Sequence, residues 1–275
     1  MHSTPSHTAD PPYSYRVLGS LEVRQRNRRI DIPKGNTLNM LAALLLNANS
    51  LVPGDMLIER MWGDRPPRTA RAVLQNSVSR LRSLTGSTRG APVMPIPIVT
   101  GPGGYTLRVQ PGALDLHRFD HIVADADRAI AEGRGRDAAG LLRQALSLWR
   151  DSTLPEVTAP GLGLVEIRRL REHRVAVLDR WAELELADGQ ANRVIPELRS
   201  AVVTMPMAER LHYQLIRALV DNHQIGEARQ LLGETEAMLR DRYGLEARSV
   251  LDRWWRQLVT NTAGYGYRWP QLVSS

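Results

Sequence analysis

The hydrophobic positions near the start of the chain form short runs of the strand type. Segments 15–23 (YRVLGSLEV) and 28–32 (RRIDI) are β-branched or aliphatic and are separated by a polar QRN turn, which predicts a hairpin within a small N-terminal sheet. Further along, segment 98–109 (IVTGPGGYTLRV) alternates around a GPGG turn and predicts a second hairpin. The first 110 residues are therefore expected to begin and to end with strands.

Between these strands the hydrophobic positions recur with a helical period. Segment 37–49 (TLNMLAALLLNAN) is rich in leucine and alanine and too long for a strand, so it predicts a buried helix. A second helix is predicted at 52–63, and a third at 66–86, which opens with two prolines and closes at Gly86. A sheet, three helices and a hairpin in this order are the layout of a winged helix-turn-helix domain, whose third helix would enter the major groove of DNA.

From about residue 112 the pattern is helical only, and it repeats. Segment 180–206 can be laid over segment 214–240 with an offset of 34 residues, which is the period of the tetratricopeptide helix pair. The aligned positions are Trp181 with Leu215, Val194 with Ala228, and Leu198 with Leu232. An earlier unit holds Gly133, Ala138, Leu142 and Ala145 in the frame of Gly189, Val194, Leu198 and Ala201. The extra length between these units contains 151–164, which is rich in Pro and Gly and predicts a loop.

These patterns predict two domains. We expect an α+β winged helix-turn-helix domain over residues 15–110, with a small sheet, three helices and a C-terminal hairpin as its wing. An all-α, tetratricopeptide-like helical domain is expected over 112–260. Residues 1–14 are predicted to be a disordered lead-in and 261–275 a tail.

The predicted helix at 66–86 has two different faces. Its apolar face consists of Ala70, Leu74, Ser77, Val78, Leu81 and Thr85. Its polar face consists of Arg68, Thr69, Ala72, Gln75, Asn76, Ser79 and Ser83, with Arg71, Arg80 and Arg82 on the flanks. A solvated helix face ordinarily mixes acids with bases in i, i+4 pairs, and this segment contains no acid at all. Because Gln and Asn bond adenine edges and Arg bonds guanine edges, the polar face predicts direct readout of DNA.

The distribution of charge along the chain supports the same prediction. The formal net charge is +7, and the first 110 residues hold 14 Arg or Lys and 6 Asp or Glu. The remaining residues hold 22 basic and 23 acidic residues, so the positive excess belongs to the predicted winged-helix domain. A basic domain of this kind is typical of proteins that bind nucleic acid.

No pattern in the sequence predicts catalysis, a metal site or a cofactor. The absence of cysteine excludes disulfides, thiolate zinc sites and cysteine nucleophiles. The GPGG turn at 101–104 lacks the GK[ST] ending of a phosphate-binding loop. His117 and His121 have the spacing of a zinc pair, but Arg118 stands where the HExxH motif requires Glu. We therefore expect a protein that is not an enzyme and binds no cofactor or metal.

The sequence also carries no pattern that predicts membrane insertion or export. No stretch approaches the ~20 apolar residues that a membrane helix requires. The N-terminus has no basic region followed by an apolar one, and the lack of cysteine suits a reducing compartment. We expect a cytoplasmic protein without membrane contacts.

Several segments together carry a resemblance to a known family. They are YRVLGSLEV at 15–23, LLLNAN at 44–49, MWGDRPPRTARAVLQNSVSRLRSL at 61–84, GYTLRV at 104–109 and LDLHRF at 114–119. With them the chain resembles the Streptomyces antibiotic regulatory proteins, in which an OmpR-type winged helix is joined to a bacterial transcriptional activation domain. No ATPase module follows residue 260, so the expectation is a small, stand-alone member.

The resemblance implies a function and a set of DNA-facing residues. It implies an activator that reads direct repeats in promoters of secondary-metabolite (antibiotic) gene clusters, binds double-stranded DNA as a homodimer or in tandem, and recruits RNA polymerase holoenzyme. The implied DNA-facing residues are Arg68, Thr69, Arg71, Gln75, Asn76, Ser79, Arg80 and Arg82. Arg108, after the predicted wing turn, and Lys34, before the first predicted helix, are further expected contacts to DNA. Two alternatives stay open at this stage: a repressor of the same architecture, and a tetratricopeptide scaffold whose basic domain binds an acidic protein.

Overall fold

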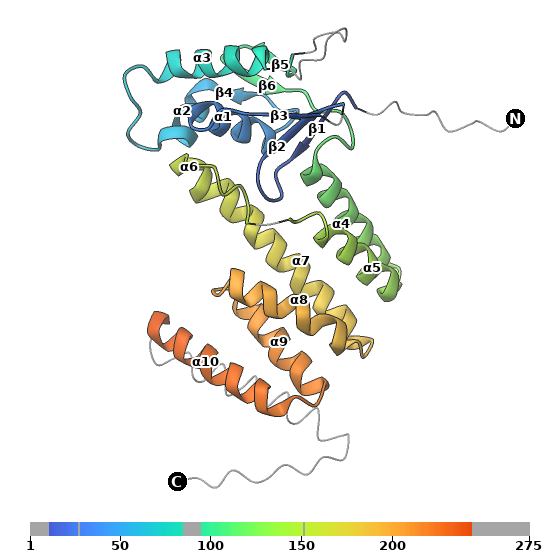
Figure 1. The fold of residues 1–275 in the computed structure, drawn as a ribbon. Coiled ribbons are helices and arrows are strands. Elements are labelled where there is room, and N and C mark those ends of the chain that lie inside the picture. The colour runs from blue at the N-terminus through green and yellow to red at the C-terminus, as the bar shows by residue number, and fades with distance from the viewer. Residues whose placement is uncertain (1–10, 27, 85–94, 151, 244–275) are drawn as a thin grey trace, which may run out of the picture. The chain divides into compact units, whose positions relative to one another are not determined.

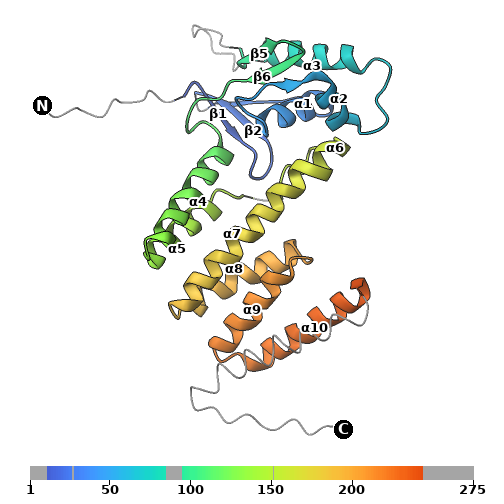
Figure 2. The ribbon, with the colours of Figure 1, turned by 180° about the vertical axis from the view of Figure 1, so that it is seen from behind.

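The computed structural model describes residues 11–26, 28–84, 95–150 and 152–243 (Figure 1; Figure 2 shows the reverse side). Its contacts divide the chain into two compact units. The first comprises Met1–Asp125 and Gln144–Arg174, and the second comprises Ala126–Arg143 and Val175–Ser275. The packing therefore divides the chain differently from the sequence boundary predicted at 110–112, because two later segments belong to the first unit.

The N-terminal sheet of the first unit is an antiparallel meander. Its strands are β1 (Tyr13–Arg16), β2 (Glu22–Gln25) and β3 (Arg28–Ile30), in the order β1-β2-β3. The predicted hairpin across the QRN turn is present as β2 and β3. The run at 15–23, however, does not form a single strand. The run reverses direction at Gly19, whose φ of 139° is one that residues with a side chain rarely adopt. Its first residues therefore belong to β1 and its last residues to β2.

Three helices and the wing complete the winged helix-turn-helix. The helices are α1 (Asn36–Leu45), α2 (Gly54–Trp62) and α3 (Ala70–Ser83). The wing is the hairpin of β5 (Ile98–Gly101) and β6 (Gly104–Leu107), and β4 (Val52–Pro53) pairs with β6 on its other side. The predicted architecture is thus confirmed for this part of the chain.

Three of the predicted helix boundaries were wrong. The first helix ends at Leu45 and not at residue 49, and the residues after it form turns. Residues 52 and 53 form β4, so the second helix begins at Gly54. The third begins at Ala70, because Thr69 before it has a non-helical backbone (φ −90°, ψ 7°), and the N–H of Ala70 closes a turn onto the carbonyl of Pro67 at 2.9 Å. The predicted stop at Gly86 lies outside the described residues.

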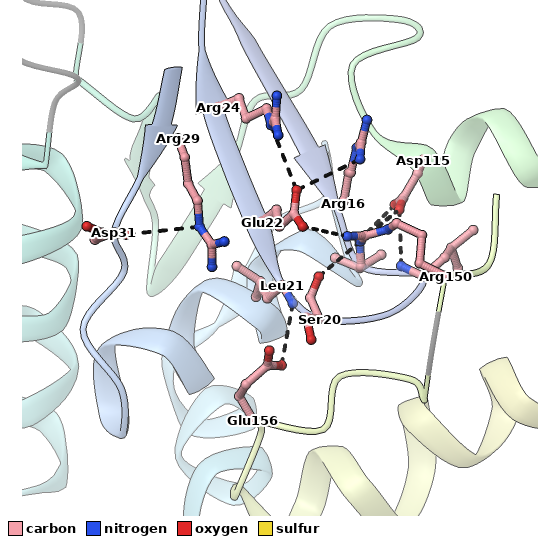
Figure 3. A network of polar contacts seen from close by, with 12 residues as sticks. Arg16, Ser20, Leu21, Glu22, Arg24, Arg29, Asp31, Asp115, Arg150 and Glu156 are labelled. Carbon is pink, nitrogen blue, oxygen red and sulfur yellow. Dashed lines mark hydrogen bonds and ion pairs between the residues drawn. The ribbon is translucent and has the colours of Figure 1, made fainter. Parts of the chain in front are cut away.

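The turn between β1 and β2 is held by residues from much later in the chain (Figure 3). Asp115, the first residue of α4 (Asp115–Ala131), accepts hydrogen bonds from the N–H groups of Val17 at 2.8 Å and Leu18 at 3.1 Å. Arg150 donates to the Glu22 carboxylate at 2.8 Å and to the Ser20 carbonyl at 3.0 Å. These contacts explain why the start of α4 and the segment after α5 (Gly135–Leu146) belong to the first unit.

Asp115 is buried within this network. Burial raises the pKa of its carboxyl, while the hydrogen bonds from the backbone of Val17 and Leu18 and the charge of Arg150 act in the opposite direction. Two backbone donors that would otherwise be buried without partners are thereby satisfied. Asp115 thus links the N-terminal sheet to the first helix that follows the wing.

The second unit is built from helix pairs. After the first pair, which ends with α5, come α7 (Arg168–Ala187) with α8 (Ala191–Thr204) and α9 (Glu209–Asp221) with α10 (Ile225–Tyr243). The short helix α6 (Pro160–Leu162) and the π-helix η1 (Gly163–Ile167) lead into α7 within the first unit. The predicted loop at 151–164 is therefore helical at its end. None of the described helices is both long and apolar enough to cross a membrane.

The turns within the three pairs repeat the same backbone geometry. Gly133, Gly189 and His223 all have left-handed backbones, with φ of 73°, 73° and 61°. In each turn the next N–H donates to a carbonyl five residues earlier at 2.8 Å: Arg134 to Ala129, Gln190 to Glu185, and Gln224 to Leu219. The frame predicted from the sequence repeat is thus confirmed. Of the aligned positions, Trp181, Leu215, Val194, Ala228 and Leu198 are buried, and Leu232 is half-buried.

Candidate nucleic-acid interface

One face of α3 fixes the helix in the domain core. Ala70, Leu74, Ser77, Val78 and Leu81 are all buried, and α3 packs against α1 and α2. Each fully buried aliphatic side chain of this kind contributes about 1.5–3 kcal/mol to folding. The predicted apolar face is confirmed for these residues, whereas Thr85 lies outside the described part of the chain.

The opposite face of α3 is open to solvent. Its exposed residues are Arg68, Thr69, Ala72, Gln75, Asn76, Ser79, Arg80 and Ser83. Within the described residues, the side chains of Gln75, Asn76 and Ser79 make no hydrogen bond. Arg68 and Thr69 lie in the turn that precedes the helix, so they flank its N-terminus, where unpaired backbone N–H groups favour anions. This arrangement leaves side-chain donors and acceptors available to an outside molecule.

Arg71 has a partner that the local sequence did not reveal. Its guanidinium lies 3.0 Å from the Asp55 carboxylate of α2, and the two side chains are 81% and 83% exposed. An ion pair this exposed contributes little to stability, so a phosphate could replace the carboxylate at small cost. The Arg71 guanidinium therefore has the charge and the exposure that a contact to a DNA phosphate requires.

Arg82 is engaged within the domain. Its Nε and Nη2 atoms donate to the carbonyl of Ile98 at 3.0 and 2.7 Å, and Nη2 also donates to the Thr100 hydroxyl at 2.8 Å. The side chain is half-buried, and it ties the end of α3 to strand β5 of the wing. The family resemblance implied that Arg82 would face DNA, a contact that stays a prediction, and in the structure its guanidinium connects the helix to the wing.

The wing is held close to α2 by its glycines. At Gly104, a Cβ atom would lie 2.2 Å from the Val52 carbonyl oxygen, so no other residue fits there. Gly103 has a φ of 70° at the tip, and its carbonyl accepts the N–H of Gly54 at 2.8 Å. The predicted GPGG turn is thus a tight wing turn fixed to the start of α2.

The two remaining predicted contacts, Lys34 and Arg108, are both exposed. Lys34 precedes α1, and Arg108 follows β6 with its backbone N–H bonded to the Pro97 carbonyl at 2.9 Å. They come from segments other than α3. The structure also exposes Arg26, Arg28 and Arg29 at the β2–β3 hairpin, where the run RQRNRR was the available sequence signal.

The histidine pair considered for zinc has an ordinary setting. His121 is 78% exposed and lies 3.9 Å from the Asp125 carboxylate on the next turn of α4. Across the described ranges, no three histidine, aspartate or glutamate side chains gather in a way that could hold a metal ion.

Comparisons with known proteins agree with this geometry. Residues 114–258 match the family model of the bacterial transcriptional activator domain. Regulatory protein DnrI of Streptomyces peucetius is 28% identical over 263 residues, covering 94% of this chain and 96% of DnrI. Regulatory protein AfsR of Streptomyces coelicolor is 31% identical over 238 residues, covering 86% of this chain. The chain thus spans nearly all of DnrI but only 23% of AfsR.

A solved structure supports the fold along most of the chain. The structure of Mycobacterium tuberculosis EmbR in complex with a low-affinity phosphopeptide superposes with a TM-score of 0.73 at 28% identity. It covers 92% of this chain and 69% of the EmbR chain. The activator-domain match extends over more than half of the sequence and follows directly on a winged helix-turn-helix. The chain therefore belongs to the Streptomyces antibiotic regulatory proteins, a family of transcriptional activators.

Proposed function

We propose that the chain activates transcription of a secondary-metabolite gene cluster by reading direct repeats near the promoter through α3 and by recruiting RNA polymerase holoenzyme. Arg68, Thr69, Gln75, Asn76, Ser79 and Arg80 are the proposed contacts at the major groove. Arg71, Arg108 and Lys34 are the proposed phosphate contacts. The protein acts in the cytoplasm, where the promoters and the polymerase are.

The single observation that carries the proposal is the composition of the exposed face of α3. That face presents amides, hydroxyls and guanidinium groups without one acid from its own helix. Amides suit adenine edges and guanidinium groups suit guanine edges, whereas an acidic protein partner would need only the positive charges. Gln75 and Asn76 therefore favour DNA over an acidic protein as the ligand of this face.

Tandem or dimeric binding follows from the proposed target. A direct repeat offers the same base sequence twice in the same orientation, so each copy of the chain would read one repeat with its own α3. Neighbouring copies would then lie on one face of the duplex when the repeats are one helical turn, roughly 10.5 base pairs, apart. Inserting five base pairs between the repeats should therefore abolish joint binding and leave single-site binding intact.

A footprint on the promoters neighbouring the gene tests the DNA reading. The expected result is protection of two directly repeated segments that is lost in the Gln75→Ala variant. Arg229→Ala provides a matched control, because Arg229 is exposed on α10 in the second unit. An absence of any protected repeat would contradict the proposal and would favour the acidic-protein alternative.

Transcription in vitro with purified polymerase separates activation from repression. Adding the chain should raise the transcript from a promoter that carries the protected repeats. A lower transcript with the same footprint would identify a repressor, and an unchanged one would exclude direct recruitment of the polymerase.

A further inference from the structure

A second exposed surface of the first unit is unlike the reading face of α3. It lies where η1 leads into α7 and begins with two aliphatic side chains, Leu164 and Val165, which are 69% and 59% exposed. One turn further on, Arg168 and Arg169 are also exposed. We name these four residues the η1 strip. Two aliphatic side chains open to water beside two arginines form a surface of mixed chemistry.

The π-helical geometry of η1 turns these aliphatic side chains outward. Leu162 and Ile167 are five residues apart, and both are buried, at 0% and 4% exposure. In an α-helix, residues five apart point about 140° away from each other, whereas the wider π-turn brings them to the same side. With Leu162 and Ile167 directed inward, Leu164 and Val165 between them face solvent. Single π-turns of this kind are often found at functional sites.

The η1 strip is mounted firmly on the helix-turn-helix. Gly161 lies so close to α2 that a Cβ atom would come within 2.6 Å of the Cα of Arg60. The guanidinium of Arg60 is 2.7 Å from the Glu166 carboxylate, and both side chains are largely buried. Figures 1 and 2 both show α6 beside α2, the helix that precedes α3. A partner held at the strip would therefore be held on the DNA-binding unit itself.

The chemistry of the strip defines the partner that it fits. Aliphatic side chains of a partner would cover Leu164 and Val165 and remove their apolar surface from water, which favours binding. Arg168 and Arg169 would donate hydrogen bonds to carboxylates of the partner one turn away, in place of the exposed and weak pair that Arg168 makes with Glu172 at 3.7 Å. Aliphatic and acidic side chains one turn apart describe one face of an amphipathic helix.

We propose that the η1 strip docks an acidic, amphipathic helix of RNA polymerase holoenzyme while α3 occupies DNA. The proposal rests on the proposed function, since it names the surface through which recruitment occurs. Because the strip and the reading face consist of different residues, polymerase contact and DNA contact can be removed separately.

Four variants of the full chain test this proposal. The apolar half is removed by Leu164→Ser with Val165→Ser, and the charge is reversed by Arg168→Glu with Arg169→Glu. Matched controls are Val203→Ser on α8, where the side chain is 79% exposed, and Arg229→Glu on α10. Circular dichroism and thermal unfolding establish that each variant is folded, as the exposure of the strip residues predicts.

The measurements use a labelled promoter fragment and purified polymerase holoenzyme as the probe. The affinity of each variant for DNA alone should stay within about twofold of the wild type, because such exposed residues lie off the reading face. The concentration of holoenzyme needed to shift the protein–DNA complex should rise by about tenfold for both strip variants, as expected when central interface residues are lost. The two controls should behave as the wild type in both measurements.

Several results would overturn the proposal. Unchanged recruitment by both strip variants would show that the polymerase docks elsewhere. Weaker binding of the strip variants to DNA alone would show that the strip contacts DNA. A changed sedimentation of these variants without DNA would show that the strip is a contact between copies of this chain. A wild-type chain that binds its repeats but recruits no holoenzyme would instead contradict the proposed function, and the strip proposal with it.

Discussion

The arginines of α3 and those of the second unit are used in different ways. In the second unit, Arg199 pairs with Glu227 at 2.6 Å and Arg136 with Asp188 at 2.9 Å, so opposite charges from different segments neutralise each other. On α3 no acid of the same helix is available, and the exposed pair of Arg71 with Asp55 comes from α2. A surface that satisfies its own charges needs no anion from outside, whereas the α3 surface favours one.

The same comparison extends to the polar side chains. On α9, Gln214 is buried and donates to the Asp179 carboxylate of α7 at 2.8 Å. On α3, Gln75 and Asn76 are exposed. The second unit thus uses the Gln214 amide to hold helices together, whereas α3 presents the amides of Gln75 and Asn76 outward. Equal residue types carry different functions because their burial differs.

The largest expected effect is a loss of folding stability, which we expect from the buried face of α3 and not from its exposed face. Leu81→Ala removes a fully buried side chain and should lower the free energy of unfolding of the first unit by about 2–5 kcal/mol. Urea denaturation measures this loss, and Ser83→Ala, at an exposed position, is the control. A loss below about 0.5 kcal/mol, typical of surface positions, would show that this face is not packed as described.

The next effect concerns the exposed face alone. Gln75→Ala or Asn76→Ala should weaken binding at the cognate repeat by about 1–3 kcal/mol and relax base preference, with the unfolding free energy unchanged. Titration of cognate and base-substituted duplexes measures both quantities. If the affinities for the cognate and the non-specific duplex fell equally, Gln75 and Asn76 would not be contacts to bases.

Arg82 tests whether a guanidinium of α3 serves the fold or the DNA. Arg82→Ala removes the hydrogen bonds to Ile98 and Thr100, and should cost about 1–2 kcal/mol of folding stability. Thr100→Val removes one of these bonds and should cost less. Reduced DNA affinity with unchanged stability would restore Arg82 to the DNA-facing set predicted from the sequence.

Arg108 should show the opposite behaviour. It is exposed after the wing, so Arg108→Ala should leave stability unchanged and weaken every DNA duplex to a similar extent. The slope of log affinity against log salt should fall by about one unit, as for the loss of one phosphate contact. Binding measured from low to moderate salt on cognate and random duplexes checks this, and a loss confined to the cognate site would contradict it.

The smallest expected effect is a pH dependence of the stability of the second unit. Burial lowers the pKa of His212, although its hydrogen bond with the Pro206 carbonyl, at 3.0 Å, and the charge of Glu209 act in the opposite direction. The folded state therefore favours the neutral ring. Its contribution is fully present above the ordinary histidine pKa of about 6.5 and is lost as the pH falls through the lowered folded value.

Hydrogen exchange of α9 amides at pH 7.5 and at successively lower pH checks this expectation. After correction for intrinsic exchange rates, protection should decrease toward acid pH in the wild type, and less so in His212→Gln. Equal pH dependence in both proteins would assign the effect to another group.

Much of the fold could be predicted because it depends on periodicity within single elements. The buried positions of α3 follow from a 3.6-residue period, and the 34-residue offset placed the helix-pair turn at His223 in register with Gly189. Strand and helix ends were less predictable. Residues 52 and 53 pair with β6, some 50 positions away, so the helix predicted from residue 52 begins at Gly54, with Pro53 as its N-cap.

The residue types of the candidate site could be predicted from the sequence, but whether each side chain is free to contact another molecule could not. Exposure of Gln75, Asn76 and Ser79 follows from their place on the helix, and it was confirmed. The engagement of Arg82 was missed, since Ile98 and Thr100 lie on another element and no local pattern links them to α3. That the exposed residues contact DNA stays a prediction, which the variants above test.

The sequence by itself determined the two faces of α3, the absence of acids beside its arginines and the frame of the helical repeat. These are properties of one segment at a time, and local geometry is enough to produce them. The tertiary structure decided which arginines remain available, and it joined Asp115 and Arg150 to the β1–β2 turn. Hydrogen bonds between distant segments depend on how those segments approach in space, which side-chain periodicity within each segment does not specify.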